Sequence, residues 1–290
     1  MKIIILVPIY NDWKSASKLI EEINSKVSGL NCLFSIIFVN DASTEQQSIY
    51  LPNVENLQSI KIINMKENKG HARCIATGLK YIFENEQFDY VIPMDGDGED
   101  RPEEIKNFVE HAKYTPDKTI VGERVKRSEN LFFRFCYSIH KILTFVFTGQ
   151  SIKFGNYTCL PKLTVEKMIN DKATWSSFSG ALTKVEKDRS STPSIRGTRY
   201  FGPSKMSYKN LIIHSLSIIA VFKLNVLLRS ILFLAVYIFL IHQNITVIML
   251  IPIILVILLL VSIFSILNRE NLNELNNSLT NIINIDKIKE

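Results

Sequence analysis

The stretch YVIPMDGDGED, residues 90–100, decides how this chain of 290 residues folds. Its first five residues are mostly apolar, and four carboxylates and two glycines follow within six residues. A short apolar run that ends in a polar loop is typical of a buried strand in a parallel sheet. Because ligands bind outside the carboxyl ends of such strands, we expect the loop Asp95–Asp100 to lie in the functional site.

The same pattern of an apolar run and a polar loop occurs three more times before residue 90. A candidate helix follows each run, and this alternation indicates an α/β fold with a mostly parallel sheet. The expected strands are Ile3–Val7, Ser35–Val39, Ile60–Asn64 and Tyr90–Met94, and the expected helices are Asp12–Val27, a weak one near 44–49, Gly70–Glu84 and Pro102–His111.

The acidic loop itself indicates a metal site. Alternation along an extended backbone places Asp95, Asp97 and Glu99 on one side. Carboxylates this close repel one another, and a hard divalent cation relieves the repulsion while it also holds substrate phosphates. We therefore expect the loop to bind Mg²⁺ or Mn²⁺; the alternative interpretation is a solvated acidic turn. The glycines of the loop would let a diphosphate approach closely.

Charge is distributed in three blocks along the chain. Residues 1–123 carry 13 Lys and Arg against 19 Asp and Glu, residues 124–223 carry 17 against five, and the remainder carries four of each. The sequence pI of about 9.0 therefore hides a basic block directly before the most apolar part of the chain. That position favours attraction to an anionic lipid surface, and we expect no binding to nucleic acid.

Two apolar segments in the last quarter of the chain are long enough to cross a membrane. Ile245–Leu267 holds 23 residues without a charge, which makes a helix of about 35 Å for a hydrocarbon core of about 30 Å. Leu224–Ile241 is the second candidate, and Arg229 in its first turns would extend toward the interface. The residues between them carry no Lys or Arg, whereas cations flank the pair, so both ends are expected in the cytoplasm.

Two further stretches, Leu131–Phe147 and Tyr208–Phe222, combine a broad apolar face with a polar stripe. This pattern is typical of helices that lie in a membrane interface, and it also occurs in core helices of soluble domains. At the other end of the chain, the first apolar run is short and stops at Pro8, which does not fit a secretion signal. We therefore expect the front half to remain in the cytoplasm.

Four motifs of the front half occur together in a characteristic order. VPIYND (7–12), VNDAST (39–44), NKGHARCIATGL (68–79) and MDGDGEDRPEEI (94–105) resemble the nucleotide-sugar-binding half of the family 2 glycosyltransferases, which have the GT-A fold. The basic block, the stretch RYFGPSKMS (199–207) and the two apolar segments narrow the resemblance to the polyprenyl-phosphate glycosyltransferases, which include dolichol-phosphate mannose synthase.

This resemblance implies a domain organisation and a reaction. It implies a donor-binding half of a GT-A domain at 1–123, an acceptor-side half with amphipathic juxtamembrane helices at 124–223, two transmembrane helices at 224–267 and a cytoplasmic tail at 268–290. The implied reaction is inverting transfer of one sugar from a nucleotide diphosphate-sugar to a polyprenyl phosphate at the cytoplasmic membrane. Assembly into a homo-oligomer is left open.

The resemblance also implies roles for the residues at matching positions. The nucleotide-sugar would be bound by Pro8, Tyr10, Asp12, Asp41, Asn68, Gly70, Arg73 and Asp95. The metal would be held by Asp95, Asp97 and Glu99. The acceptor phosphate would be held by Arg199, Ser204 and Lys205. The residues of the chemical step would be Asp95, Asp97, Arg73 and Asn156.

One departure from the family pattern concerns the chemical step. Bacterial relatives often carry a Gly-Asp-Phe-Arg-like stretch whose Asp is a proposed base, and this chain has Asn156 in that place. An amide does not accept a proton at neutral pH, but an acceptor phosphate is already anionic. Asn156 would then orient the acceptor oxygen, and the identity of any base stays open.

Two other functions remain open on the sequence. An enzyme of the same class could extend a glycan already attached to a lipid carrier; a phosphate acceptor would differ by needing a cationic pocket that includes Arg199 and Lys205. A catalytically silent, membrane-anchored binding subunit is the second alternative, and the intact carboxylate cluster argues against it.

Overall fold

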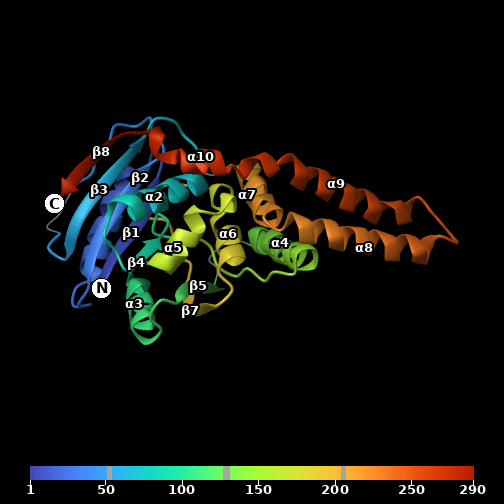
Figure 1. The fold of residues 1–290 in the computed structure, drawn as a ribbon, viewed down its shortest axis with the longest axis horizontal. Helices are drawn as coiled ribbons and strands as arrows, with labels where there is room; N and C mark the ends of the chain where they lie inside the picture. Colours follow the sequence, from blue (N-terminus) through green and yellow to red (C-terminus); the bar gives the residue numbers. More distant parts are fainter. Residues whose placement is uncertain (51–53, 127–130, 204–206) are drawn as a thin grey trace. The chain divides into compact units, whose positions relative to one another are not determined.

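The structure is a computed structural model that describes residues 1–50, 54–126, 131–203 and 207–290, with the backbone alone at 126 and 131–137. It divides into two compact units. The first comprises 1–128, 153–204 and 271–290, and the second comprises 129–152 and 205–270. The sheet lies in the first unit and the long apolar helices lie in the second (Figure 1).

One mixed sheet forms the centre of the first unit. Eight strands of the described chain pair in the order β7-β5-β6-β4-β1-β2-β3-β8. The four strands predicted from the sequence are confirmed, and they pair in parallel with one another. The strands are β1 (Lys2–Ile9), β2 (Leu33–Asn40), β3 (Leu57–Met65), β4 (Tyr90–Pro93), β5 (Thr119–Lys126), β6 (Thr158–Pro161), β7 (Arg189–Ile195) and β8 (Ile282–Lys289).

The helices of the first unit pack their apolar faces against this sheet or against one another. In the first of them, Leu19, Ile20 and Ile23 are fully buried at helical spacing, as expected for one face of an amphipathic helix. The helices are α1 (Trp13–Lys26), α2 (His71–Asn85), α3 (Ile105–Tyr114), α5 (Lys162–Ile169), α6 (Phe178–Val185) and α10 (Leu272–Asn276), with 3₁₀ turns η1 (Pro102–Glu104), η2 (Lys172–Trp175) and η5 (Ser278–Asn281).

The prediction of a weak helix near 44–49 is wrong, because this segment has no helical structure. The side chain of Asn11 explains the difference. Its Oδ1 accepts hydrogen bonds from the backbone N–H groups of Thr44 (2.9 Å) and Glu45 (3.0 Å). These donors are thereby satisfied by a residue of the neighbouring loop, so they do not enter a helix.

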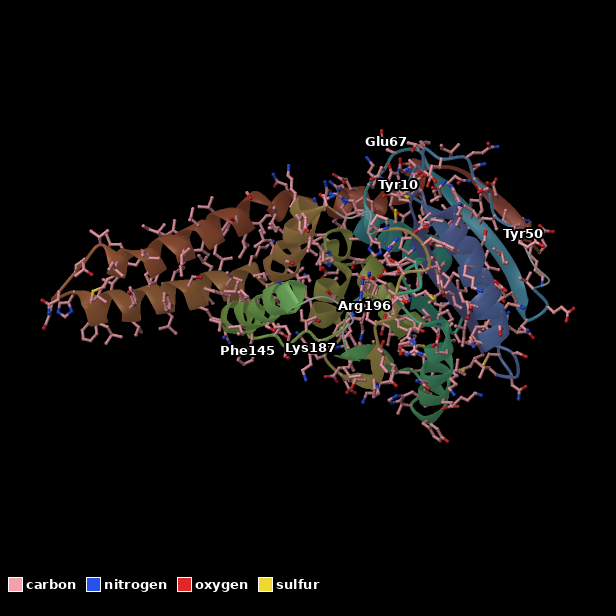
Figure 2. All side chains as sticks on the ribbon, turned by 180° about the vertical axis from the view of Figure 1, so that it is seen from behind. Tyr10, Tyr50, Glu67, Phe145, Lys187 and Arg196 are labelled. Carbon is pink, nitrogen blue, oxygen red and sulfur yellow. The ribbon has the colours of Figure 1, made fainter. Side chains whose placement is uncertain are left out.

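The second unit consists of helices α4 (Leu131–Thr148), α7 (Tyr208–Ala220), α8 (Lys223–Ile241) and α9 (Ile251–Ser265), with turns η3 (Ile248–Leu250) and η4 (Leu267–Arg269). Two helical segments of the described chain, Lys223–Ile241 and Ile248–Asn276, are long and apolar enough to cross a membrane. Their side chains are largely exposed, as Leu240 (71%) and Leu255 (60%) illustrate. Phe145 on α4 is 58% exposed as well (Figure 2).

Arg229 contacts the end of a neighbouring helix. Its Nη1 donates to the carbonyl of Val146 at 3.0 Å, while Asn225 Nδ2 donates to the carbonyl of Thr148 at 3.1 Å. These carbonyls belong to the last turn of α4, where no further helical N–H is available. Gly149 lies directly against the Arg229 guanidinium with a φ of +74°. Two polar side chains of α8 therefore cap the end of α4.

The C-terminal residues also differ from the expected tail. Strand β8 pairs antiparallel with β3 and adds an edge strand to the sheet. Asn64 Nδ2 donates to Asp286 Oδ2 at 2.8 Å, and Lys289 Nζ donates to the carbonyls of Val54 and Leu57. Pairing satisfies the backbone groups that β3 would otherwise leave exposed at the edge, so residues 271–290 form part of the sheet unit.

The basic block at 124–223 does not form one separate half in the structure. Its strands β5, β6 and β7 belong to the same sheet as β1–β4, whereas α4 and α7 belong to the helical unit.

Candidate active site

Loops that follow the carboxyl ends of β1 and β4 meet at a single guanidinium. Arg199 Nη2 donates to Asp12 Oδ2 at 3.0 Å, and its Nη1 donates to Asp97 Oδ2. The three side chains are 16–19% exposed. Asp12 begins α1 but makes no side-chain cap to it, which leaves its carboxylate for Arg199. The parallel sheet therefore assembles the acidic residues as the sequence predicted, with an arginine between them.

Asp95 is held by residues from two other segments. His71 Nε2 lies 3.0 Å from Asp95 Oδ1, and Asn156 Nδ2 lies 3.4 Å from the same oxygen. The backbone N–H of Asp95 donates to Asp100 Oδ2 at 2.9 Å. One oxygen of Asp95 is thus shared by an imidazole and an amide, and the structure brings Asn156 to the acidic loop.

The carboxyl groups of this loop perturb one another. Burial and the neighbouring charge of Asp95 raise the pKa of Asp97 to about 6 and that of Asp100 to about 7. Burial would also raise the pKa of Asp95, but the hydrogen bond and charge of His71, aided by Arg196 and Arg124, hold it well below its usual range. Asp95 therefore stays ionised at pH values at which Asp97 and Asp100 take up protons.

A segment that we call the arginine strap, Arg196–Tyr200, lies along the acidic loop. The backbone N–H of Gly197 donates to the carbonyl of Glu99, and that of Tyr200 to the carbonyl of Asp97, both at 2.8 Å. Arg196, which is labelled in Figure 2, forms an ion pair through its Nη2 with Glu99 Oε2. Two backbone hydrogen bonds and two arginines thus join the strap to the loop.

Two features of the sequence allow this close approach. Gly98 has a φ of +89°, and a Cβ there would lie 2.7 Å from the Tyr200 ring, so only glycine fits. Before the strap, the carboxylate of Glu104 accepts from Ser194 Oγ (2.7 Å) and from the backbone N–H of Ile195 (2.8 Å). The buried Glu104 thereby fixes the end of β7, from which the strap leaves.

The loops after β2 and β3 are joined by Asp41. Its Oδ1 accepts from the N–H of Lys69 at 2.7 Å and its Oδ2 from the N–H of Gly70 at 2.9 Å. Asp41 is 5% exposed, and Gly70 has a φ of +89° where α2 begins. Asp41, which the resemblance implies as a nucleotide-sugar-binding residue, therefore also shapes the loop that starts α2.

The other predicted donor-site residues are distributed around these loops. Pro8 is buried within β1, so its side chain does not belong to the loop that follows, and Asn68 is exposed. Tyr10 is 38% exposed just after β1 (Figure 2). Arg73 lies in the first turn of α2 with its guanidinium 5.5 Å from the centre of the Trp175 ring.

The predicted acceptor residues are not all described. Ser204 and Lys205 lie outside the described residues. Arg199, the third of them, contacts Asp12, which was predicted to bind the nucleotide-sugar, and Asp97, which was predicted to hold the metal.

The predicted metal ligands offer only carboxylate oxygens as donor atoms. Such oxygens suit Mg²⁺ or Mn²⁺, and burial together with the charge of Asp95 raises the pKa of Asp97, as expected where carboxylates lie close together. The chemistry therefore fits a hard cation. Yet across the described ranges no group of three or more His, Cys, Asp or Glu side chains is arranged to hold one, because Asp97 and Glu99 are each turned toward an arginine.

The sequence assigned no role to two residues of this site, His71 and Arg196. His71 lies within one of the quoted motifs, so its position could have been found there. Arg196 lies outside every motif, and its partner Glu99 is 97 residues away in the sequence. A contact over that separation leaves no local pattern.

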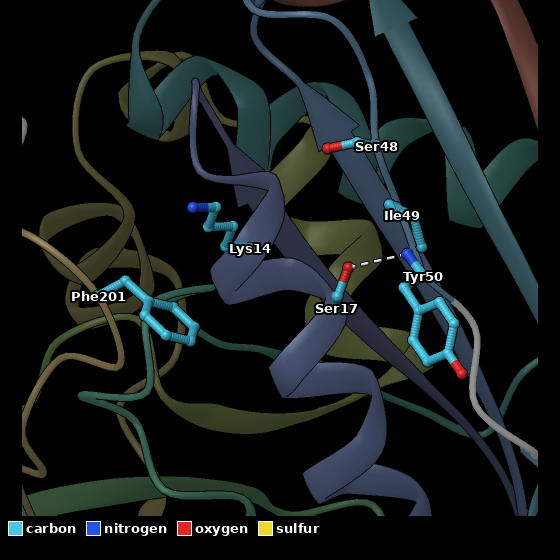
Figure 3. Close-up of a pocket in the computed structure, with 6 residues that line it drawn as sticks. All are labelled: Lys14, Ser17, Ser48, Ile49, Tyr50 and Phe201. Carbon is cyan, nitrogen blue, oxygen red and sulfur yellow. Dashed lines mark hydrogen bonds between the residues drawn. The ribbon is translucent and has the colours of Figure 1, made fainter.

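A shallow pocket of about 540 Å³ lies beside this site, on the exposed side of α1 (Figure 3). Ser17 Oγ in it accepts from the backbone N–H of Tyr50 at 3.1 Å. Its lining residues are Lys14, Ser17, Ser48, Ile49, Tyr50 and Phe201.

Comparison with known proteins extends these observations. The chain is 25% identical over 218 residues to an undecaprenyl-phosphate 4-deoxy-4-formamido-L-arabinose transferase of Salmonella choleraesuis. The match covers 73% of this chain and 64% of the relative, so the chain spans somewhat under two thirds of the relative's length.

Solved structures show the same fold at low identity. Glucosyl-3-phosphoglycerate synthase from Mycobacterium tuberculosis, in complex with Mn²⁺, UDP and glucosyl-3-phosphoglycerate, superposes with a TM-score of 0.54 at 13% identity, over 77% of this chain and 79% of that one. S. aureus TarS 1–349 in complex with UDP-GlcNAc gives 0.51 at 15% identity, over 79% and 70%. The expected GT-A-like α/β fold is thereby confirmed.

A protein-family model matches more than half of the chain. Residues 4–174 match the family described as Glycosyl transferase family 2. This range contains the loops after β1, β2, β3 and β4, and it ends just before Trp175. The chain therefore belongs to glycosyl transferase family 2.

Proposed function

We propose that this chain transfers one sugar from a nucleotide diphosphate-sugar to a polyprenyl phosphate at the cytoplasmic face of a membrane. The observation that carries the proposal is the cluster of Asp95, Asp97 and Glu99 at the carboxyl end of β4, with arginines held against it. Two helices that are long and apolar enough to span a membrane support a lipid substrate. The name of the Salmonella relative supports undecaprenyl phosphate as the acceptor class.

The donor would bind across the carboxyl ends of β1, β2 and β4. Asp41 shapes the loop beside the nucleotide, and Arg73 supplies positive charge for the diphosphate. Asp95, Asp97 and Glu99 would hold Mg²⁺ or Mn²⁺, which when bound stabilises negative charge on the leaving diphosphate. The arginines of the strap must then leave these carboxylates, because Asp97 and Glu99 are each ion-paired with an arginine in the structure.

The acceptor would approach from the face opposite the leaving group, which gives inversion. Asn156, whose amide lies beside Asp95, would orient the acceptor oxygen. Arg199 and Arg196, when released from the carboxylates, would supply guanidinium groups for phosphates. A phosphate oxygen is already anionic at neutral pH, so this arrangement requires no strong base.

A second candidate is transfer to a glycan on a lipid carrier. The position of Arg199 supports this candidate. The arginine is bound by Asp12 and Asp97 and does not by itself form a separate cationic pocket for an acceptor phosphate.

The experiment that tests the proposal is a transfer assay with purified full-length protein in detergent. A panel of nucleotide-sugars is incubated with Mn²⁺ and either undecaprenyl phosphate or lipid-linked glycans, and the lipid products are separated. We expect a single sugar on undecaprenyl phosphate. Product formed on the glycan alone would support the second candidate, and donor binding without any transfer would support a silent binding subunit.

A further inference from the structure

The side chain of Arg73 rests on an aromatic ring. Its guanidinium carbon lies 5.5 Å from the centre of the Trp175 ring, within the range of a cation–π interaction. Its Nη1 also lies 3.4 Å from the carbonyl of Lys69. An arginine has several rotatable bonds, and the ring face restricts them to one side of the first turn of α2.

Trp175 is itself fixed by a residue from the far end of the chain. The indole is 2% exposed, and its Nε1 donates to Glu274 Oε2 at 2.7 Å. A donor buried to this extent requires a partner, and a carboxylate gives a short, strong hydrogen bond. The hydrogen bond therefore sets the rotation of the ring whose face Arg73 contacts.

Glu274 has little freedom of its own. Its Oε1 accepts from Asn271 Nδ2 at 3.0 Å, and its backbone N–H donates to Asn271 Oδ1 at 3.0 Å. This reciprocal pair resembles a capping box at the start of α10. The next residue, Leu275, is fully buried against Ala76 and Trp175. Ala76 lies one helical turn after Arg73, so α10 packs beside the same turns of α2.

We propose that Trp175 and Glu274 are positioning residues for Arg73. The inference rests on the proposed function, in which Arg73 acts on the diphosphate of the donor. Glu274 orients the indole, and the indole holds the guanidinium in the position required for the diphosphate before the donor arrives. The segment after the apolar helices thus contributes to donor binding, in addition to closing the edge of the sheet.

Four variants of the full-length protein test this inference. Trp175→Phe keeps an aromatic face and removes the N–H; Glu274→Ala removes the acceptor, and Glu274→Gln restores an acceptor of similar size. Asp286→Ala is the matched control, because it removes another carboxylate of the C-terminal segment. Asp286 lies in β8, accepts a hydrogen bond from Asn64 of β3 and does not contact Trp175. Unfolding temperatures are measured for all four.

The readouts are nucleotide affinity and the kinetic constants for the donor. Each protein is titrated with UDP and with GDP in Mn²⁺ by calorimetry. We expect Trp175→Phe and Glu274→Ala to weaken nucleotide binding and raise the donor KM by about threefold to tenfold. Glu274→Gln should recover most of the loss. Asp286→Ala should lower the unfolding temperature without changing the nucleotide affinity.

Combination with Arg73→Ala separates positioning from general destabilisation. If the three residues act as a unit, adding Trp175→Phe to Arg73→Ala should cause no further loss of affinity. Additive losses, or an equal loss in Asp286→Ala, would overturn the inference.

The same set distinguishes this inference from the proposed function. Normal transfer and binding by Arg73→Ala would overturn the role of Arg73 together with the inference. An impaired Arg73→Ala beside unaffected Trp175→Phe and Glu274→Ala would overturn the inference alone. Intrinsic fluorescence adds a direct readout: in a Trp13→Phe background Trp175 is the remaining tryptophan, and its emission should change on nucleotide binding.

Discussion

Arg199→Ala is the substitution for which the structure predicts opposite effects on stability and on metal binding. Arg199 joins Asp12 to Asp97, and all three side chains are 16–19% exposed. Removing one partner of a fully buried pair costs about 3–5 kcal/mol. Because these groups retain contact with solvent, we expect about 2 kcal/mol without metal, or a fall in unfolding temperature of about 4–8 °C for a unit of this size.

The same substitution should strengthen metal binding. In the wild type, a divalent cation must displace the Arg199 guanidinium from Asp97, and this competition is absent in the variant. A relief of about 1.4 kcal/mol corresponds to a tenfold gain in affinity, so calorimetric titration with Mn²⁺ should show a gain of about this size. The decrease in unfolding temperature caused by Arg199→Ala should be smaller in saturating Mn²⁺, because the bound cation then neutralises the charge of the carboxylates.

Arg189→Ala is the control, since it removes a guanidinium stacked on the Phe154 ring. It should lower the unfolding temperature equally with and without Mn²⁺. An Arg199→Ala protein that binds Mn²⁺ no better than the wild type, and that loses the same stability in both conditions, would refute the exchange of arginine for metal.

Three further predictions follow from the site and the helices. Asp97→Asn should lower kcat by orders of magnitude without unfolding the protein, and excess EDTA should abolish transfer by the wild type; full turnover in EDTA would contradict the metal site. Without metal, stability should decrease as the pH rises from about 4 to about 7, because Asp97 and Asp100 have folded pKa values of about 6 and about 7, above about 3.9 when unfolded, so the folded state binds more protons in this window. The lowered pKa of Asp95 affects stability below about pH 4 and does not cancel this dependence. Thermal unfolding of the wild type and of Asp100→Asn across this pH range measures the slope of stability against pH, and an equal slope in both proteins would refute the prediction. Finally, Gln243→Cys in a background without the native cysteines should react with an impermeant thiol reagent from outside intact cells and Asn273→Cys should not, and the reverse pattern would reject the proposed topology.

The parallel strands could be predicted because the signal is local. Ile3–Val7 and Tyr90–Met94 are apolar runs with a polar loop directly behind them, and parallel pairing brings such loops to one edge whatever the rest of the chain does. The acidic loop was located in this way. The two long apolar helices were predicted for the same reason, because length and composition suffice to identify them.

Contacts between distant segments could not be predicted from such patterns. Arg199 lies 187 residues from Asp12, and Trp175 lies 99 residues from Glu274. Strand β8 has no strong alternation of apolar and polar residues, and it forms because the edge of β3 offers unpaired backbone groups. The segment at 44–49 shows the same limit, since the side chain of Asn11 determines its conformation.

The measurement that tests the central claim most directly is transfer of a labelled sugar to undecaprenyl phosphate by purified full-length protein. The assay compares Mn²⁺ with EDTA, and wild type with Asp97→Asn, at a fixed concentration of the nucleotide-sugar that binds best. We expect one labelled sugar per lipid phosphate, formed only by the wild type and only with metal. Equal product in EDTA, or no product on undecaprenyl phosphate beside transfer to a lipid-linked glycan, would contradict the account.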